Sequence, residues 1–293
     1  MIFLILCNLV YSITVFTGII TDYPNTRYFN LSYIYVDKDL VWFEQIIPLN
    51  KYGNYLYSDF DGTHYIFVTI SNNFKTYKIY NISKEGELCS GPFITNESIT
   101  NINQYYLTKE LYTSIIFQRK YSFIEINLLL NTSIIIYNTS TLSIRKYSTL
   151  IQNDHLLYYS LEDGSDTRIY GFDILNTTNH FELGTLLPEH SNYIMDLFND
   201  DRNLYAVIFD RVDNNQKLII IDIITHTKAI VIVYPESFYY TSSSLNDDKL
   251  YLFMTDFDNN YFVITDLISR TYTIKKINLN GYLPIQIWFN KEI

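Results

Sequence analysis

Residues 193–234 have the sequence YIMDLFNDDRNLYAVIFDRVDNNQKLIIIDIITHTKAIVIVY, and this stretch decides the fold. It contains four short apolar runs, which are Tyr193–Phe198, Leu204–Asp210, Lys217–Ile223 and Lys228–Tyr234. Runs of this length that are rich in Ile, Val, Tyr and Phe and are separated by polar turns are typical of β-strands. The stretch therefore predicts four strands, numbered from the inner to the outer, that are joined by tight turns.

The same unit recurs along the chain. An apolar run that ends in Asp or Asn places this polar residue at Asp37, Asn81, Asn127, Asp173, Asp222 and Asp266, with spacings of 44, 46, 46, 49 and 44 residues. A second marker is a three-residue segment that contains a tyrosine. It begins at His64, Glu110, Leu156, Asn203 and Lys249, with spacings of 46, 46, 47 and 46 residues. Two markers that share one period, with four strands in each unit, indicate the blades of a β-propeller.

The two ends of the chain complete each other. Residues 13–47 supply only the second, third and fourth strands of a blade, whereas Pro284–Phe289 supplies an inner strand without the other three. We therefore expect an all-β fold, a six-bladed propeller of four-stranded antiparallel blades that forms a single domain over residues 13–293. The pairing of Pro284–Phe289 with Ile13–Ile20 would close the ring and remove an open sheet edge.

One stretch resembles a known family. Residues Leu250–Asp256 are similar to the repeat of the receptor-type YWTD propellers, which also have six blades. The interval from Tyr251 to Asp256 is two residues longer than in that repeat, and no Trp follows the Tyr. The resemblance implies the propeller fold and no activity.

The N-terminus predicts export. Residues 1–12 combine a short apolar run with Val10-Tyr11-Ser12, which suits signal peptidase, so we expect a cleaved signal peptide and a secreted protein. A membrane anchor over Met1–Ile20 and a strand are the alternatives. Secretion would allow N-glycosylation at six Asn-x-Ser/Thr sequons, which are Asn30, Asn81, Asn96, Asn131, Asn138 and Asn176.

The formal charge of −10 excludes most nucleic-acid binders, since these need clustered Lys and Arg. The negative charge also disfavours binding to an anionic membrane surface. We expect contact with a membrane only if the N-terminal segment is an uncleaved anchor. No catalytic, metal or phosphate-binding motif occurs, so we expect no cofactor and no metal, and we assign no catalytic residue. The expected partner is a protein or a glycan, and the acidic surface favours a basic one.

Two groups of polar residues are candidate sites. The first is an acidic sector in the turns between second and third strands of three consecutive blades. Its members are Glu162, Asp163 and Asp166, then Asp210 and Asp213, then Asp256 and Asp258. These turns suit a cation or a basic segment, although Asp is also a common residue of solvated turns.

The second group lies on the inner strands, where polar side chains can converge on the central channel. It consists of the carboxylates Asp59 and Asp196 with Gln104 and Gln286. The sequence thus favours a non-catalytic binding or scaffolding propeller. The alternative is a hydrolase or lactonase centred on the channel, which four or more convergent polar groups would favour.

Overall fold

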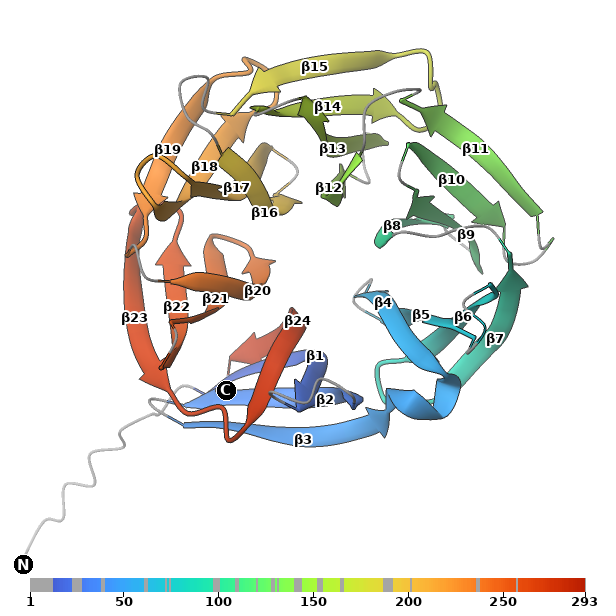
Figure 1. Cartoon of the computed structure of the whole chain (residues 1–293), viewed down its shortest axis with the longest axis horizontal. Helices are drawn as coiled ribbons and strands as arrows, with labels where there is room; N and C mark the ends of the chain where they lie inside the picture. Colours follow the sequence, from blue (N-terminus) through green and yellow to red (C-terminus); the bar gives the residue numbers. More distant parts are fainter. Residues whose placement is uncertain are drawn as a thin grey trace, which may run out of the picture.

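The four runs of residues 193–234 form one antiparallel sheet, and six such sheets stand around a central axis (Figure 1). The computed structural model is therefore a six-bladed β-propeller, as the repeat predicts. The structure describes residues 13–22, 28–37, 40–60, 63–71, 73, 75–96, 101–108, 111–119, 121–127, 130, 132–139, 144–151, 155–163, 166–186, 192–200, 202–235, 238–256 and 258–292. Of residues 101–115, 145–147, 150, 151, 162, 163, 166, 192, 193, 291 and 292, the side chains lie outside this description.

Each blade runs from an inner to an outer strand. The first complete blade consists of β4 (Asn54–Phe60), β5 (His64–Ile70), β6 (Tyr77–Ser83) and β7 (Leu88–Thr95). The second consists of β8 (Asn101–Thr108), β9 (Leu111–Gln118), β10 (Ser122–Asn127) and β11 (Thr132–Asn138). The third consists of β12 (Ile144–Ile151), β13 (Leu156–Asp163), β14 (Asp166–Asp173) and β15 (His180–Thr185). The next two are β16 (Asn192–Asn199), β17 (Asn203–Asp210), β18 (Asn215–Asp222) and β19 (Lys228–Val233); and β20 (Tyr239–Asn246), β21 (Lys249–Thr255), β22 (Asn260–Asp266) and β23 (Thr271–Ile277).

The sixth blade joins the two ends of the chain. Its strand order is β24 (Tyr282–Glu292), β1 (Thr14–Asp22), β2 (Phe29–Asp37) and β3 (Leu40–Pro48). β24 pairs antiparallel with β1, with Gly18 opposite Ile287, which confirms the predicted closure. The single helical element among the described residues is the 3₁₀ turn η1 (Leu49–Tyr52), which connects this blade to β4. No helix in the described ranges is long and apolar enough to cross a membrane.

The core lies between the faces of neighbouring blades. The described side chains of the second strands are mostly buried on both faces of the sheet, and all residues of β5 from Tyr65 to Ile70 are buried. Phe16 of β1 makes edge-on contacts with Tyr251, Phe253 and Phe262 of the preceding blade at ring-centroid distances of 5.2–6.1 Å. Edge-on aromatic pairs of this kind add stability beyond the burial of their area. The closing blade is thus fixed by packing as well as by strand pairing.

Tryptophan packing in this blade is divided between two places. Trp288 of β24 contacts Phe60 and Tyr65 of the next blade, at ring-centroid distances of 5.8 and 5.4 Å. Trp42 of β3 stacks instead on Tyr35, at 5.0 Å. Residues 1–12 lie outside the described part of the chain, so the signal peptide stays a prediction.

Candidate functional site

The inner strands share one irregularity. In each of them the pairing register with the second strand shifts near the start of the strand, where the inner strand carries extra residues. Bulges of this kind redirect the side chain that follows them and are frequent beside functional sites. The residues directly after the shift are Tyr57, Gln104, Ser148, Asp196, Ser242 and Gln286, at spacings of 47, 44, 48, 46 and 44 residues. We call these six residues the bulge ring.

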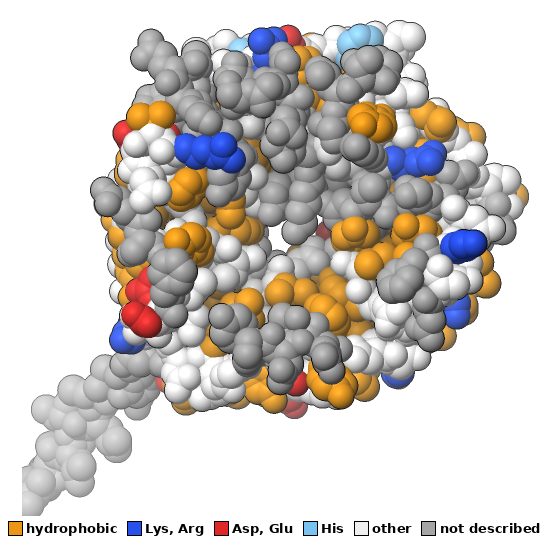
Figure 2. Space-filling view, viewed as in Figure 1, with side chains coloured by type: hydrophobic (Ala, Val, Ile, Leu, Met, Phe, Trp, Pro, Cys, Tyr) orange, Lys and Arg blue, Asp and Glu red, His pale blue; other side chains and the backbone are white. Residues whose placement is uncertain are grey.

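The bulge ring surrounds a cavity of about 420 Å³ in the channel. Five of its members line this cavity, and the side chain of the sixth, Gln104, lies outside the described part of the chain. Asp59 lines the cavity as well. The structure brings Asp59, Asp196 and Gln286, three of the four channel candidates, to one cavity. The described surface in Figure 2 is hollowed at its centre, and its charged side chains lie mainly toward the rim.

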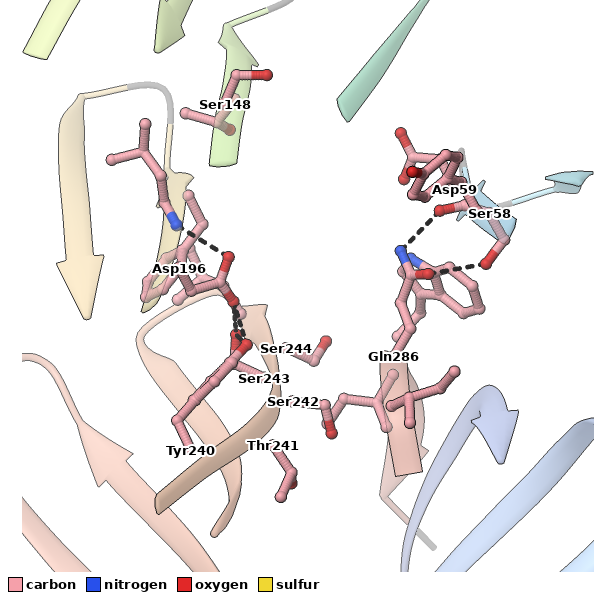
Figure 3. A pocket seen from close by; sticks show the side chains of 18 of the residues that line it. Ser58, Asp59, Ser148, Asp196, Tyr240, Thr241, Ser242, Ser243, Ser244 and Gln286 are labelled. Carbon is pink, nitrogen blue, oxygen red and sulfur yellow. Dashed lines mark hydrogen bonds between the residues drawn. The ribbon is translucent and has the colours of Figure 1, made fainter. Parts of the chain in front are cut away.

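Asp196 anchors one side of the cavity (Figure 3). Its Oδ2 accepts hydrogen bonds from Tyr240 Oη, at 2.5 Å, and from Ser243 Oγ, and its Oδ1 accepts one from the backbone N–H of Leu197, at 2.8 Å. Tyr240 and Ser243 belong to β20, so these bonds connect two neighbouring blades. Hydrogen bonds to a charged group are stronger than those between neutral groups. The Asp196 carboxylate is therefore held in one fixed position.

Gln286 anchors the opposite side (Figure 3). Its Oε1 accepts a hydrogen bond from Ser58 Oγ at 2.8 Å, and its Nε2 donates to the carbonyl oxygen of Ser58 at 2.7 Å. These two bonds connect β24 with β4 across the junction between the last and first blades. Gly18 allows β24 to lie close to β1, because a Cβ at this position would come within 2.5 Å of the carbonyl oxygen of Gln286. The chain closure thus positions Gln286.

Ser148 differs from these residues. Its Oγ is buried, the residue is 6% exposed, and this oxygen has no hydrogen-bond partner within the described ranges, although the residue lines the cavity. A buried hydroxyl group without a partner is costly, since it has lost its bonds to water. Its neighbour Thr149, in contrast, accepts a hydrogen bond from Asn199 Nδ2 at 2.7 Å. Ser148 is the described polar group of the cavity that a ligand would satisfy.

The two carboxylates of the cavity lie far apart in the ring order. Asp59 is on β4, in the first complete blade, and Asp196 is on β16, in the fourth. In a ring of six, these two blades stand opposite each other, and Figure 3 shows the two side chains on opposite sides. The two carboxylates therefore face the cavity from opposite sides.

The acidic sector has a different structure from the one its sequence suggests. Asp210 is fully buried, and its Oδ2 accepts a hydrogen bond at 2.7 Å from Nζ of Lys217, which also pairs with the half-exposed Asp213. Burial alone would raise the pKa of Asp210, but the bonds from Lys217 and from the backbone amides of Val212 and Asp213 outweigh it, so the pKa is lowered. In this turn, the positive charge of Lys217 therefore offsets much of the negative charge of Asp210 and Asp213.

The next turn of the sector is stabilised by neutral groups. Asp256 accepts hydrogen bonds from Tyr261 Oη at 2.6 Å and from the backbone amides of Asp258 and Asn259. The bond from Tyr261 is the main reason that the pKa of Asp256 falls to about 2. The side chains of Glu162, Asp163 and Asp166 lie outside the described part of the chain. Within that part, no group of three or more His, Cys, Asp or Glu residues could hold a metal ion.

The sequons differ in accessibility. Asn96 and Asn176 are exposed and lie directly outside strands, whereas Asn30 is half-buried in β2 and Asn138 is exposed at the end of β11. Asn81 lies in the middle of β6 and is only 5% exposed. A glycan needs its asparagine side chain in solvent, so this burial is incompatible with glycosylation of Asn81 in the folded protein. Asn131 lies outside the described residues.

No protein-family model and no curated protein matches this sequence. Solved structures share the fold. A chain from a nidogen–laminin complex aligns with a TM-score of 0.65 at 11% identity over 94% of this chain and 98% of that chain. TolB from Acinetobacter baumannii aligns with a TM-score of 0.63 at 14% identity over 94% of this chain and 66% of its own. Oligogalacturonate lyase from Vibrio parahaemolyticus aligns with a TM-score of 0.53 at 10% identity over 90% and 72%. At these identities the likeness shows the fold alone.

Sequence reasoning missed the hydroxyl groups of the cavity. Ser58, Ser148, Tyr240 and Ser243 were not among the predicted channel residues, although all four line the cavity. The run Thr241-Ser242-Ser243-Ser244, which precedes the marker at Lys249, was an available signal, since it gathers four hydroxyl side chains in one segment. The bulges are the reason that spacing alone failed, because an extra residue changes the face on which each later side chain lies.

Proposed function

We propose that this propeller is a non-catalytic binding module that takes a hydroxyl-rich ligand of the carbohydrate class into its central channel. The observation that carries the proposal is the bulge ring, because all five of its members with described side chains line the channel cavity. One of these residues, Ser148, has a buried hydroxyl group without a partner among the described residues. A bound ligand would supply that partner.

The chemistry of the lining supports this ligand class. Ser and Tyr hydroxyls and the Gln amide can both donate and accept hydrogen bonds, and the hydroxyl groups of a sugar do the same. An anion would need mainly donors, and a cation would need mainly acceptors. Trp288 and Tyr55 also line the cavity and offer apolar ring faces. A volume of about 420 Å³ is within the range of small-molecule sites.

The test is isothermal titration calorimetry with a panel of neutral mono- and disaccharides. We expect Ser148→Ala to weaken binding of the sugar that binds best by about tenfold, the effect of one lost hydrogen bond. The same variant should not lower the melting temperature, because it removes a hydroxyl group that lacks a partner. Thr273→Ala, which removes an exposed hydroxyl group on β23, is the control and should bind as the wild type does. Failure of every sugar to bind would contradict the ligand class.

The alternative is a channel-centred hydrolase or lactonase. More than four polar groups converge on the cavity, which is the feature that favours an enzyme in the sequence analysis. The fold itself is compatible with both functions, since a nidogen–laminin complex and an oligogalacturonate lyase contain it. Turnover of an aryl ester or a lactone that Asp196→Asn abolishes would favour the enzyme and contradict a non-catalytic role.

We further propose that the protein is secreted after removal of residues 1–12. Glycosylation would then be expected at Asn96 and Asn176, the two sequons that are exposed and lie outside strands. N-terminal sequencing of material from the culture medium should begin near Ile13. An intact Met1 in that material would contradict the proposal.

A further inference from the structure

The turns between third and fourth strands share one feature. In the second to fifth complete blades each of these turns exposes a Leu or an Ile. They are Leu130 (71% exposed), Leu175 (67%), Ile224 (90%) and Ile268 (74%), the four most exposed large apolar side chains of the described residues. The two other blades expose Leu40 (53%) and Leu88 (49%), each the first residue of a fourth strand. We call these six residues the apolar rim.

The Asp or Asn marker of the sequence repeat fixes this exposure. In four blades, Oδ1 of the marker residue accepts a hydrogen bond from a backbone N–H of the turn. The pairs are Asn127 with Leu130, Asp173 with Leu175, Asp222 with Ile224, and Asp266 with Ser269, at 2.7–2.9 Å. Turns closed by an Asp or Asn side chain have a defined backbone conformation, so the apolar side chain is held in solvent. The repeat that builds the blades thus also presents the apolar rim.

The apolar rim lies on one face of the propeller. All six blades have the same antiparallel strand order from the inner to the outer strand, so the third-to-fourth turns are at the same end of every sheet. The outer strands that these turns precede form the circumference of the ring in Figure 1. The six side chains therefore stand around the edge of one face, and polar turn residues separate them.

This arrangement suits a particular kind of partner. Only an extended and nearly flat surface can touch side chains around a whole circumference at once. A protein interface usually has a continuous apolar patch, whereas the rim offers single side chains with gaps between them. A lipid bilayer is flat and fluid, so separate apolar side chains can each enter the boundary between headgroups and acyl chains. The geometry of the rim therefore favours a membrane surface.

The charges of this face decide which lipid fits. Leu267, beside Ile268, donates a hydrogen bond at 2.8 Å to the carbonyl oxygen of Asp248, which shows that the β20–β21 turn lies at the same end of the blade. This end exposes Asp247 and Asp248 together with Arg270. Anionic headgroups would meet these acidic residues and a chain with a net charge of −10. A zwitterionic headgroup carries a phosphate and an ammonium group, so it matches exposed charges of both signs.

We propose that the apolar rim docks this protein on the surface of a zwitterionic membrane of the phosphatidylcholine type. Leu130, Leu175, Ile224 and Ile268 enter the interface, and Arg270 lies at the level of the phosphates. The contact requires no N-terminal anchor, in contrast to the expectation from the sequence. It leaves the turns between second and third strands, on the other face of the propeller, in solvent.

The test is flotation of the full chain with phosphatidylcholine vesicles in a density gradient. Wild type should float with the vesicles. Ile224→Asp should weaken partitioning by at least about tenfold, because it removes the burial of a large aliphatic side chain and adds a charge. Ile224→Asp/Ile268→Asp should abolish flotation. Residues 1–12 are present in every variant, so differences between variants report on the turns.

Val212→Asp is the matched control. Val212 is 62% exposed in the β17–β18 turn of the same blade, and its backbone N–H likewise donates to an aspartate, Asp210, but this turn lies on the opposite face. The variant has the same change of charge and should float as the wild type does. All these variants should keep the wild-type melting temperature, because the substituted side chains are exposed.

Tryptophan fluorescence locates the contact. Ile224→Trp should still bind, and brominated phosphatidylcholine should quench its added fluorescence, whereas the added fluorescence of Val212→Trp should not change. Phosphatidylserine in the vesicles should weaken binding of the wild type, since the headgroup adds negative charge.

Four outcomes would overturn the proposal. They are a wild-type chain that does not float, equal effects of Ile224→Asp and Val212→Asp, tighter binding on addition of phosphatidylserine, and quenching of Val212→Trp. A wild-type dimer that does not float and that Ile224→Asp converts to a monomer would assign the rim to a second copy of the chain instead.

Discussion

Two turns in neighbouring blades have the same position, the same length and a similar acidic sequence, yet they are built differently. In the β17–β18 turn, Asp210 is buried and paired with Lys217, which lies two residues into β18. In the β21–β22 turn, Thr255 corresponds to Asp210, and Phe262 corresponds to Lys217. Phe262 packs on Phe16 of the closing blade instead of forming an ion pair.

The difference shows that an acidic turn is not evidence of an acidic site. In both turns the carboxylates accept hydrogen bonds from the backbone amides of the turn, as Asp does in many turns. In the β17–β18 turn, Lys217 of the following strand neutralises the negative charge of the carboxylates. In the β21–β22 turn, Phe262 stands at the corresponding position and supplies no positive charge to the carboxylates. The residue that decides between these outcomes lies in the strand and not in the turn.

The largest test of this comparison removes the cation. Lys217→Met should leave the buried Asp210 carboxylate without its charged partner and lower the free energy of unfolding by about 3–5 kcal/mol. Urea denaturation measures this loss. The double variant Asp210→Asn/Lys217→Met should recover most of the stability, because it removes the buried charge but keeps an acceptor for the turn. A double variant as unstable as the single one would show that the charge is not the cause.

The second test varies pH. The pKa of Asp210 is lowered, so the stability that this group contributes is present above about pH 4 and is lost as pH falls through the lowered value. For Lys217, burial favours the neutral form, but hydrogen bonds to Asp210 and Asp213 outweigh it and raise the pKa. Its contribution is present below about pH 10 and is lost as pH rises through the raised value. The stability of the wild type relative to that of the double variant should therefore be constant from about pH 5 to 10 and should fall on both sides of this range.

The third test compares two tyrosines with the same local sequence. Asp200-x-x-Asn203-x-Tyr205 and Asp256-x-x-Asn259-x-Tyr261 both place a tyrosine hydroxyl on the aspartate, at 2.7 and 2.6 Å. Tyr205 is buried and Tyr261 is not. Tyr205→Phe should lower the free energy of unfolding by about 1.5 kcal/mol, and Tyr261→Phe should have a smaller effect, because water can replace the lost bond. Equal effects of the two variants would contradict the role of burial.

The smallest effect is expected from calcium. Lys217 neutralises the first turn, and hydrogen-bond donors occupy the Asp256 carboxylate in the second. Millimolar calcium should therefore leave the melting temperature the same as sodium chloride of equal ionic strength does. A saturable increase that Asp258→Asn abolishes would show a calcium site in the β21–β22 turn and would revive the cation-binding interpretation of the sector.

Most of the fold was predictable from the sequence. The period of about 46 residues fixed the number of blades, and the incomplete units at the two ends predicted the pairing of β24 with β1. The blade number and the closure can be predicted from the sequence because each blade repeats the same strands and needs a neighbour on each side to cover its apolar faces. The strand ends differ from the predicted ones by only a few residues, as for the predicted run Lys217–Ile223 and the observed β18 (Asn215–Asp222).

The candidate site was predictable only in part. The sequence placed Asp59, Asp196 and Gln286 on inner strands, and all three line the cavity. It did not predict that Ser58 and Ser243 would hold Gln286 and Asp196 in place, because those contacts join strands from different blades. It also placed Asp210 in a candidate site for a cation or a basic segment, with a solvated turn as the alternative, although the structure buries this residue completely.

The sequence by itself determined the blade number, the strand order and the closure of the ring, since these depend on the period of apolar runs along the chain. Tertiary structure alone decided which polar groups meet. Bulges in the inner strands direct Ser148 and Asp196 toward the channel, and packing between blades decides whether a turn faces Lys217 or Phe262. A repeat specifies the unit, whereas a site is made of the positions at which the units differ, and these come together only when the ring has closed.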